Sequence, residues 1–450
     1  MISLMFAVIT LAPMQRVSGL PTHYINYFAV TILFVASYFW ALRRGYSWWF
    51  GPTKGLMTVL LFLLLGAFLL SYVVGLSAGR YEYTITDPIA VMMIIVRLFM
   101  VFIICASARP DARGWKLILW TILVLGVLQA AICGLQYRQV GGVRPLSLLL
   151  WGAGESQMLG DESRVIGTIG NPNGAGCMMA VSIGAALVIM FYSRGLVRRY
   201  LIPLAAVIFM SIANLLWTLS RGSLFSVLGG LAGFGLVAIL FGRHRRTALI
   251  ATGVLGGLVV FFFANMEDLP IPDRMKDVFR PGEAEGTAYG GMSSRLEIWK
   301  RRVEQINEDA NPLTGYGPTM TLSVHRRFVD NDTLNFYFKA GLIGAMIWLG
   351  MKVLTMCRSF TNVFRCRTRD DFQVALFLFY ALVVFTLFGL TADTTLGAKL
   401  GDTIMVCFGL SCAQAIMLRE REQEDVEAYD APWIEGADPA TEPEMPGANC

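Results

Sequence analysis

Ser293-Ser294-Arg295-Leu296-Glu297-Ile298-Trp299-Lys300-Arg301-Arg302-Val303 lies within Asn265–Asn335, a long polar segment between two apolar runs. Ser294 and Glu297 have the spacing of a capping box, which predicts that a helix starts here. Apolar residues recur at helical spacing from Leu296 to Ile306 and predict one apolar face. Arg295 falls in the first turn, where the helix dipole disfavours a cation, so we interpret it as a ligand-binding residue. Turn residues from Asn311 to Gly317 end the predicted helix.

The composition of the whole chain indicates a membrane protein. Of its 450 residues, 55% are hydrophobic and only 15% are charged, and the mean hydropathy is +0.57. Apolar runs long enough to cross a bilayer recur throughout and predict an all-α polytopic protein with about twelve transmembrane helices. We expect one membrane domain at 1–418, which includes a large outer loop at 265–332 with short helices. A disordered acidic cytoplasmic tail is expected at 419–450.

Other compositional signals exclude several classes of function. The eight cysteines are scattered without a CxxC motif, and the three histidines are far apart. This pattern predicts neither a metal site nor a disulfide framework. The net charge of +5 is spread over the loops between apolar runs. We therefore expect no nucleic-acid partner.

The order of apolar and basic segments predicts the topology. The predicted spans are 2–14, 24–42, 55–75, 88–108, 115–136, 174–192, 201–219, 222–241, 248–264, 333–354, 372–390 and 403–418. A basic cluster follows every even-numbered span except the last, whereas the short odd-numbered loops carry few basic residues. By the positive-inside rule both termini are cytoplasmic. The loops at 137–170 and 265–335 then lie on the outer face.

Several charged residues lie inside spans or at their ends, where apolar residues would be expected. Arg97 lies in the middle of a span, which indicates either a functional residue or a structural ion pair or snorkelling side chain. Arg221 lies in a short outer turn, against the positive-inside bias, and is either a site residue or an interfacial charge. Lys339 lies one to two turns into its span and either faces a cavity or snorkels outward. Asp393 and Asp402 border the last outer loop.

Asn171-Pro172-Asn173 precedes an apolar run and allows two interpretations. The first is a turn before a helix, with Asn173 as the N-cap. The second is a helix N-terminus whose open backbone amides face a cavity and bind an anion.

Four motifs together resemble the O-antigen ligase/polymerase superfamily. They are Gly167-Thr168-Ile169-Gly170-Asn171-Pro172-Asn173, Ser220-Arg221-Gly222, Arg295-x-x-x-Trp299 with Asn311-Pro312-Leu313-x-Gly315-x-Gly317, and Asp330-Asn331-Asp332-x-Leu334 before Gly341-Leu342-Ile343-Gly344. The resemblance covers roughly residues 160–395. It implies a GT-C-like, metal-independent, inverting glycosyltransferase without a cofactor. The donor would be an undecaprenyl-diphosphate-linked glycan at the periplasmic face of the bacterial inner membrane.

The resemblance also implies roles for individual residues. Arg221 and Arg295 would hold the donor diphosphate, for which guanidinium groups are suited. Ligases of the superfamily carry His-Asn where this chain has Asp330-Asn331. Asp330 is therefore the expected general base, with His325 as the alternative. Asn331, Asn171, Asn173, Arg97, Lys339 and Asp393 complete the predicted substrate-binding set.

The Asp330-Asn331-Asp332 motif favours the exopolysaccharide and O-antigen polymerase branch. We therefore expect polymerisation of lipid-linked repeat units, with ligation of the glycan to lipid A-core or another acceptor as the alternative. Expected partners are the lipid-linked donor and acceptor and the lipid bilayer. Whether a chain-length regulator or a flippase is a further partner is left undecided by the sequence. A secondary transporter would require paired broken helices and repeats in the two halves, which the sequence does not suggest. A non-catalytic scaffold would tolerate Arg221→Ala and Arg295→Ala.

Overall fold

The computed structural model describes residues 2–12, 24–43, 52–78, 86–151, 164–192, 197–218, 220–241, 253, 257, 292–318, 331–392 and 398–430. Thirteen helices lie within these residues. They are α1 (Ile2–Leu11), α2 (Tyr24–Arg43), α3 (Pro52–Ser77), α4 (Thr86–Ala106), α5 (Ala112–Tyr137), α6 (Val143–Trp151), α8 (Pro172–Tyr192), α9 (Val197–Trp217), α10 (Arg221–Phe241), α13 (Met292–Asp309), α14 (Asp332–Arg365), α15 (Arg369–Gly389) and α16 (Ala398–Asp430). The predicted all-α class is confirmed.

The lengths and apolar character of these helices confirm a polytopic membrane protein. Within the described part of the chain, eight helices are long and apolar enough to cross a membrane, and three shorter apolar helices accompany them. These eleven helices overlap eleven of the twelve predicted spans. The remaining predicted span, 248–264, lies outside the described residues except for Gly253 and Gly257.

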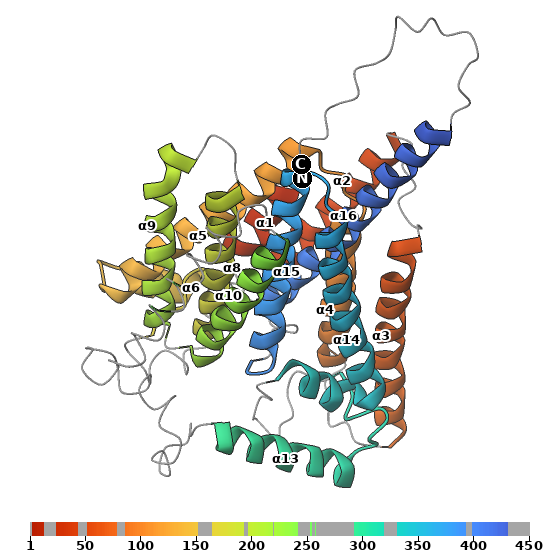
Figure 1. Ribbon diagram of the computed structural model, residues 1–450. Helices are drawn as coiled ribbons and strands as arrows, with labels where there is room; N and C mark the ends of the chain where they lie inside the picture. The colour runs from red at the N-terminus through yellow and green to blue at the C-terminus, as the bar shows by residue number, and fades with distance from the viewer. Residues whose placement is uncertain are drawn as a thin grey trace, which may run out of the picture.

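The helices form a bundle with α8, α15 and α16 inside and with α3 and α9 on opposite sides (Figure 1). In the apolar windows of α8 and α16, 89% of the residues are buried, against 33% in α3 and 28% in α9. The exposed residues of the outer helices are largely apolar, and Phe28, Phe62 and Ile202 are examples. Such a surface is the one that lipid would cover.

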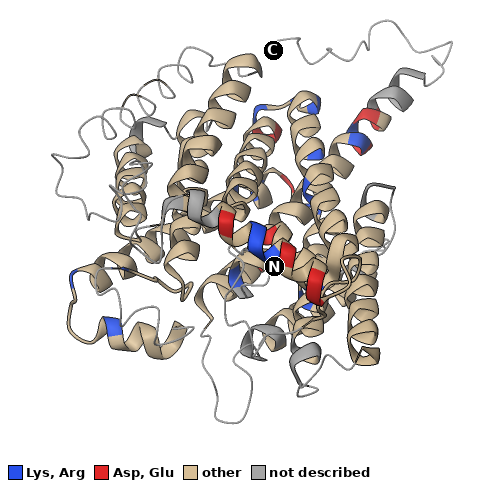
Figure 2. Cartoon of the chain, turned by 90° about the horizontal axis from the view of Figure 1, so that it is seen from below, with Lys and Arg blue, Asp and Glu red and all other residues tan. Residues whose placement is uncertain are grey.

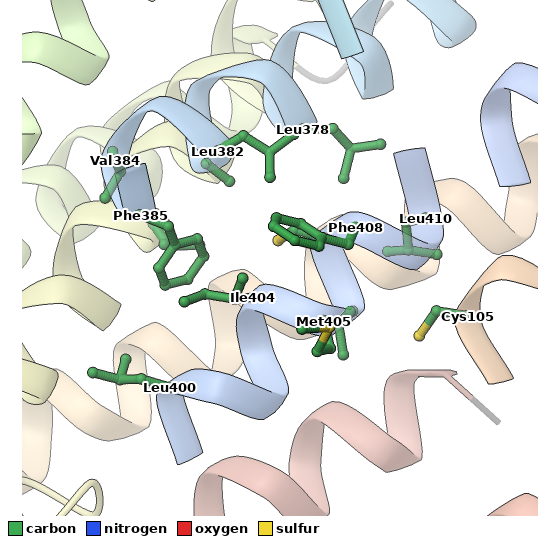
Figure 3. Close-up of a cluster of buried hydrophobic side chains, with 14 of the residues drawn as sticks. Cys105, Leu378, Leu382, Val384, Phe385, Leu400, Ile404, Met405, Phe408 and Leu410 are labelled. Atoms are coloured by element: carbon green, nitrogen blue, oxygen red, sulfur yellow. The ribbon is translucent and has the colours of Figure 1, made fainter. Parts of the chain in front are cut away.

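Glycines let the inner helices approach closely, as is usual where lipid supplies no hydrophobic driving force. A Cβ at Gly184 of α8 would lie 2.1 Å from the Tyr380 ring of α15, and one at Gly230 of α10 would lie 2.7 Å from Val384. The Tyr380 hydroxyl donates to the Ala180 carbonyl at 2.8 Å. Figure 3 shows the neighbouring apolar contact, in which Phe385 of α15 faces Ile404 of α16. The inner bundle is therefore held by close packing.

α14 is broken at Gly341, where φ is +65° and ψ is −165°. The first half of the helix, before Gly341, folds back toward the second. Phe336 and Trp348 stack at a centroid distance of 4.9 Å, although twelve residues of straight helix would span about 18 Å. The sequence predicted an unbroken span from 333 to 354, and the break corrects this prediction.

The segment Asn311–Gly317 closes the break. The Tyr316 and Gly317 amides donate to the carbonyls of Phe338 and Lys339 at 2.8 and 3.1 Å, which caps the first half of α14. The Leu342 amide donates to the Pro312 carbonyl at 2.9 Å, which caps the second half. A broken helix in a membrane needs partners for its freed backbone groups. We call Asn311–Gly317 the clamp.

The clamp is fixed to its surroundings on two sides. Ser71 of α3 places its hydroxyl 2.5 Å from the Thr314 carbonyl and 2.8 Å from the Lys339 carbonyl. The Tyr316 hydroxyl donates to the Gln305 carbonyl of α13 at 3.1 Å, and Ile306 of α13 is buried against the first half of α14. The clamp thus joins α3, α13 and both halves of α14.

α13 confirms the predicted helix and lies across one end of the bundle (Figure 1). It begins at Met292, so Ser294 lies inside the helix and not at the predicted start. Seen from that end of the bundle, it carries interleaved basic and acidic residues over mostly uncharged helices (Figure 2). Of its predicted apolar face, Ile306 is buried, but Leu296 is 54% exposed. The face therefore packs only toward the end of α13. We call this end of the bundle the α13 end.

Two boundaries differ from the predictions. The segment 137–170, predicted as an outer loop, contains α6, whose Trp151 donates from its indole to the Leu11 carbonyl at 3.1 Å. α16 continues to Asp430, so residues 419–430 are helical where the sequence predicted a disordered tail. Ion pairs with other elements hold this extension: Arg109–Glu420, Arg365–Glu422 and Arg421–Asp371. Residues 431–450 lie outside the described part.

Candidate functional site

The starts of α8, α10 and α14 meet the end of α15 at the α13 end of the bundle. Ser223 of α10 donates to the Asn173 carbonyl of α8 at 3.0 Å. Asn331, before α14, donates to the Leu390 carbonyl after α15 at 3.1 Å. A Cβ at Gly222 would lie 2.0 Å from the Thr391 hydroxyl. Three helix N-termini, each with a partial positive charge, therefore converge here.

Asn171 rather than Asn173 caps α8, which corrects the predicted cap. The Asn171 side-chain oxygen accepts from the amides of Asn173 and Gly174 at 2.8 and 3.4 Å. Pro172 occupies the first helical position, where its missing N–H costs nothing. The turn of the first interpretation is thus observed, with Asn171 and not Asn173 as its cap. Substrate binding by Asn171 and Asn173 stays a prediction.

Arg164 joins the start of α8 to the end of α9 and was missed by the sequence analysis. Its Nη2 donates to the Asn173 side-chain oxygen at 3.1 Å, and its Nε donates to the Thr218 carbonyl at the end of α9 at 3.0 Å. Ser220 follows Thr218 closely and is 2.7 Å from Ser223 through their hydroxyls. This network fixes the turn that presents Arg221, the first residue of α10.

The segment before α8 is buried although it is not helical. Gln129 of α5 accepts from the Thr168 amide at 3.0 Å and from its hydroxyl at 2.6 Å. Gln136 of α5 accepts from the Ile166 and Gly167 amides at 3.0 and 2.9 Å. Such backbone is tolerated inside a membrane only where protein groups satisfy it. The Gly-Thr-Ile-Gly part of the motif is therefore a structural element behind the site.

A buried charged cluster supports the same segment. Lys399 of α16 donates to the carbonyls of Thr168 and Thr10 at 2.5 and 3.0 Å. One turn later on α16, Asp402 pairs with Arg97 of α4 at 2.8 Å, and both side chains are fully buried. Of the interpretations left open for Arg97, the structure therefore shows the ion pair. Substrate binding by Arg97 stays a prediction.

The start of α14 contains a second buried ion pair. Asp332 Oδ2 and Lys352 Nζ are 2.9 Å apart, and the two side chains are 0% and 8% exposed. Asn331 is the N-cap of α14 and accepts from the Leu334 amide at 3.0 Å. A Cβ at Gly389 of α15 would lie 2.6 Å from Asp332 Oδ2 and 2.8 Å from Lys352 Nζ. The pair is thus enclosed between α14 and α15.

The remaining predicted residues are placed as follows. Lys339 has a half-buried side chain, and its backbone carbonyl belongs to the clamp contacts. Arg221 and Arg295 lie in the first turns of α10 and α13, but their side chains are outside what the structure describes. The described residues also do not include Asp330, His325 and Asp393, and their roles stay predictions.

Some of the charged residues that the sequence analysis missed carried a signal in the sequence. Lys352 interrupts an apolar run, and an ionisable residue in a span is a candidate site residue by default. Because the tenth span was predicted to end at 354, Lys352 was expected near the membrane–water interface, where a lysine is ordinary. Lys399 lies in the loop before the last predicted span, 403–418, where a cation is ordinary. Arg164 carries no local signal, because only the fold brings it to Thr218.

No curated protein matches this chain. A family model does match about a third of it, over the end of α9, α10, α13 and the broken start of α14. The matched segment includes Arg221, Arg295, Asp330, Asn331 and Lys339, whereas Lys352 lies just after it and Arg164 well before it. The family model is described as O-Antigen ligase and matches residues 205–349, which confirms the resemblance to the O-antigen ligase/polymerase superfamily.

Proposed function

We propose that this protein polymerises undecaprenyl-diphosphate-linked oligosaccharide repeat units of a surface polysaccharide, an exopolysaccharide or O-antigen. The family match supports a polysaccharide-related membrane enzyme of the glycosyltransferase type. The observation that carries the proposal is the α13 end of the bundle. There, the starts of α8, α10 and α14 converge, with Arg221 at the first position of α10.

In the proposed reaction an acceptor hydroxyl attacks the anomeric carbon of the donor glycan. The bond from that carbon to the diphosphate oxygen breaks, with inversion, and the lipid diphosphate leaves. Arg221 and Arg295 hold the diphosphate and offset its developing charge, a task that needs no metal. Asp330, directly before the N-cap Asn331, accepts the hydroxyl proton. The site faces the periplasm in the bacterial inner membrane, with both termini cytoplasmic.

The first test is the size distribution of lipid-linked and surface glycans in a strain that lacks this protein. Single repeat units that accumulate on the lipid carrier support polymerisation. If long polymers instead accumulate on the carrier and never reach an acceptor, the protein is a ligase. Ligase is the activity for which the matched family model is named. Unchanged pools would favour a transporter. The break in α14 is one feature that transporters share, but no second break occurs within the other described helices.

The arginine assignment is tested with Arg221→Ala and Arg295→Ala, assayed with purified protein and carrier-linked glycan. Each substitution is expected to abolish polymer formation while the protein still inserts. Lys300→Ala is the matched control on α13, because Lys300 is 78% exposed and lies 3.9 Å from Glu304 of the same helix. Normal polymer in both arginine variants would refute the diphosphate assignment. Added EDTA is expected to leave the rate unchanged.

The base is tested by comparing Asp330→Asn with His325→Ala. We expect Asp330→Asn to lower the transfer rate more, since Asp330 directly precedes Asn331, the N-cap of α14, in the sequence. The reverse order would assign the proton transfer to His325.

A further inference from the structure

The ion pair between Asp332 and Lys352 joins the two halves of the broken α14. These residues are twenty positions apart, a distance that would span about 30 Å of straight helix. Their charged atoms are nevertheless 2.9 Å apart. The pair can form only because α14 folds back at Gly341. It is therefore a contact of the folded-back conformation and not of a continuous helix.

The pair is placed where a charge is costly. Asp332 is fully buried and Lys352 is 8% exposed, and the Lys352 ammonium lies 5.2 Å from the centre of the Trp348 ring. Gly389 leaves room for the pair, since any side chain there would collide with both charged groups. Removal of one partner would leave the other charge buried, whereas removal of both would not. Apolar residues would have joined the two halves at a lower desolvation cost.

The pair is also adjacent to the proposed chemistry. Asp332 follows Asn331, which caps the first half of α14 and donates to the Leu390 carbonyl of α15. Asp330, the proposed base, is the next residue toward the N-terminus. The backbone that directly follows Asp330 in the sequence is thus held at Asn331 by α15 and at Asp332 by Lys352.

We propose that Lys352 is a positioning residue for the glycosyl transfer, which it serves through Asp332 by holding the folded-back half of α14. The inference rests on the proposed function. In this role Lys352 acts through its ion pair with Asp332 and takes no part in the bond changes of the reaction. Its charge sets the place of Asp332 and therefore the place of the residue two positions earlier that accepts the proton.

The test is a double-mutant cycle with Lys352→Met, Asp332→Asn and the combined variant, measured for thermal stability and for transfer of carrier-linked glycan. We expect each single variant to lose stability and the combined variant to regain most of it, because no unpaired charge remains. Transfer by the combined variant is expected to stay low. A displaced base lowers kcat by about 10²-fold, with little change in KM.

Two further variants sharpen the result. Lys352→Arg keeps the charge and is expected to retain more transfer than Lys352→Met. Lys116→Met is the matched control, because it removes a lysine–aspartate pair of 3.0 Å with Asp370 whose side chains are 49% and 40% exposed. We expect this control to be neutral in both assays.

The outcomes separate the inference from the function. If the combined variant regains both stability and wild-type transfer, the pair is only structural and the inference is wrong. If the wild-type protein transfers no glycan, the proposed function is wrong. A stable combined variant with low kcat beside an active wild type supports both.

Discussion

Replacing Gly341 by alanine tests whether the break in α14 and the clamp form one unit. Gly341 has φ of +65° and ψ of −165°, a backbone region that only glycine adopts without strain. A Cβ at this position would lie 2.2 Å from the carbonyl carbon and oxygen of Leu313 and 2.3 Å from the Thr314 amide nitrogen. All three are backbone atoms, which cannot rotate away. The clamp would have to move.

The expected loss follows from these contacts. The backbone strain costs about 2 kcal/mol. Displacement of the clamp breaks the bonds from the Leu342 and Ile343 amides to the carbonyls of Pro312 and Leu313, of 2.9 and 3.4 Å, at about 1 kcal/mol each. Gly341→Ala should therefore destabilise the protein by about 4 kcal/mol. Because Asn331 caps the first half of α14 and follows the proposed base Asp330 in the sequence, glycan transfer should fall as well.

Gly350→Ala is the control on the same helix. A Cβ at Gly350 meets nothing within 4 Å, and alanine is favoured over glycine in a helix by about 1 kcal/mol. The two variants are compared by thermal unfolding in detergent and by glycan transfer. Gly341→Ala is expected to melt well below the wild type, and Gly350→Ala at or above it. Equal melting and equal transfer in both variants would refute the clamp.

Two further predictions concern buried polar groups. Asp402→Asn should lower the melting temperature more than Arg97→Leu, because it removes the carboxylate from two cations, whereas after Arg97→Leu the nearby Lys399 still offsets Asp402. The opposite order in thermal unfolding would contradict this account of the cluster. Asn171→Ala should lower the free energy of unfolding by about 1 kcal/mol, because the N-cap of α8 is lost. Asn171→Ser, which can still cap the helix, should keep both stability and transfer near the wild-type values. If Asn171→Ser regains stability but transfer stays low, Asn171 also contacts the substrate.

The helices were predictable because burial in lipid needs long apolar runs, and these are visible in one dimension. The break at Gly341 was not, because it depends on the clamp, which supplies donors and acceptors from a segment about thirty residues earlier in the chain. The helical extension of α16 was missed for a similar reason. Its composition is that of a solvated tail, and ion pairs such as Arg421–Asp371, which the local sequence does not reveal, tie its described part to the bundle.

The site was predicted less completely than the fold. Spacing marked Asn171 as part of a helix start, but the choice between Asn171 and Asn173 as cap depends on backbone geometry. Arg97 was recognised as unusual, yet its partner Asp402 is 305 residues away. Asp332 and Lys352 illustrate the same limit, since their contact exists only after α14 has folded back.

The clamp also explains why the Asn-Pro-Leu-x-Gly-x-Gly and Gly-Leu-Ile-Gly motifs occur together. Gly315 and Gly341 both have positive φ, and a Cβ at Gly315 would lie 2.7 Å from the Gly341 amide nitrogen. Neither glycine can gain a side chain unless the other segment moves. Pro312 and Leu313 offer carbonyls to the second half of α14, so the two motifs are one structural unit. Its consequence for the proposed reaction is that α13, which carries Arg295, and the start of α14, which follows Asp330, are held at a fixed separation.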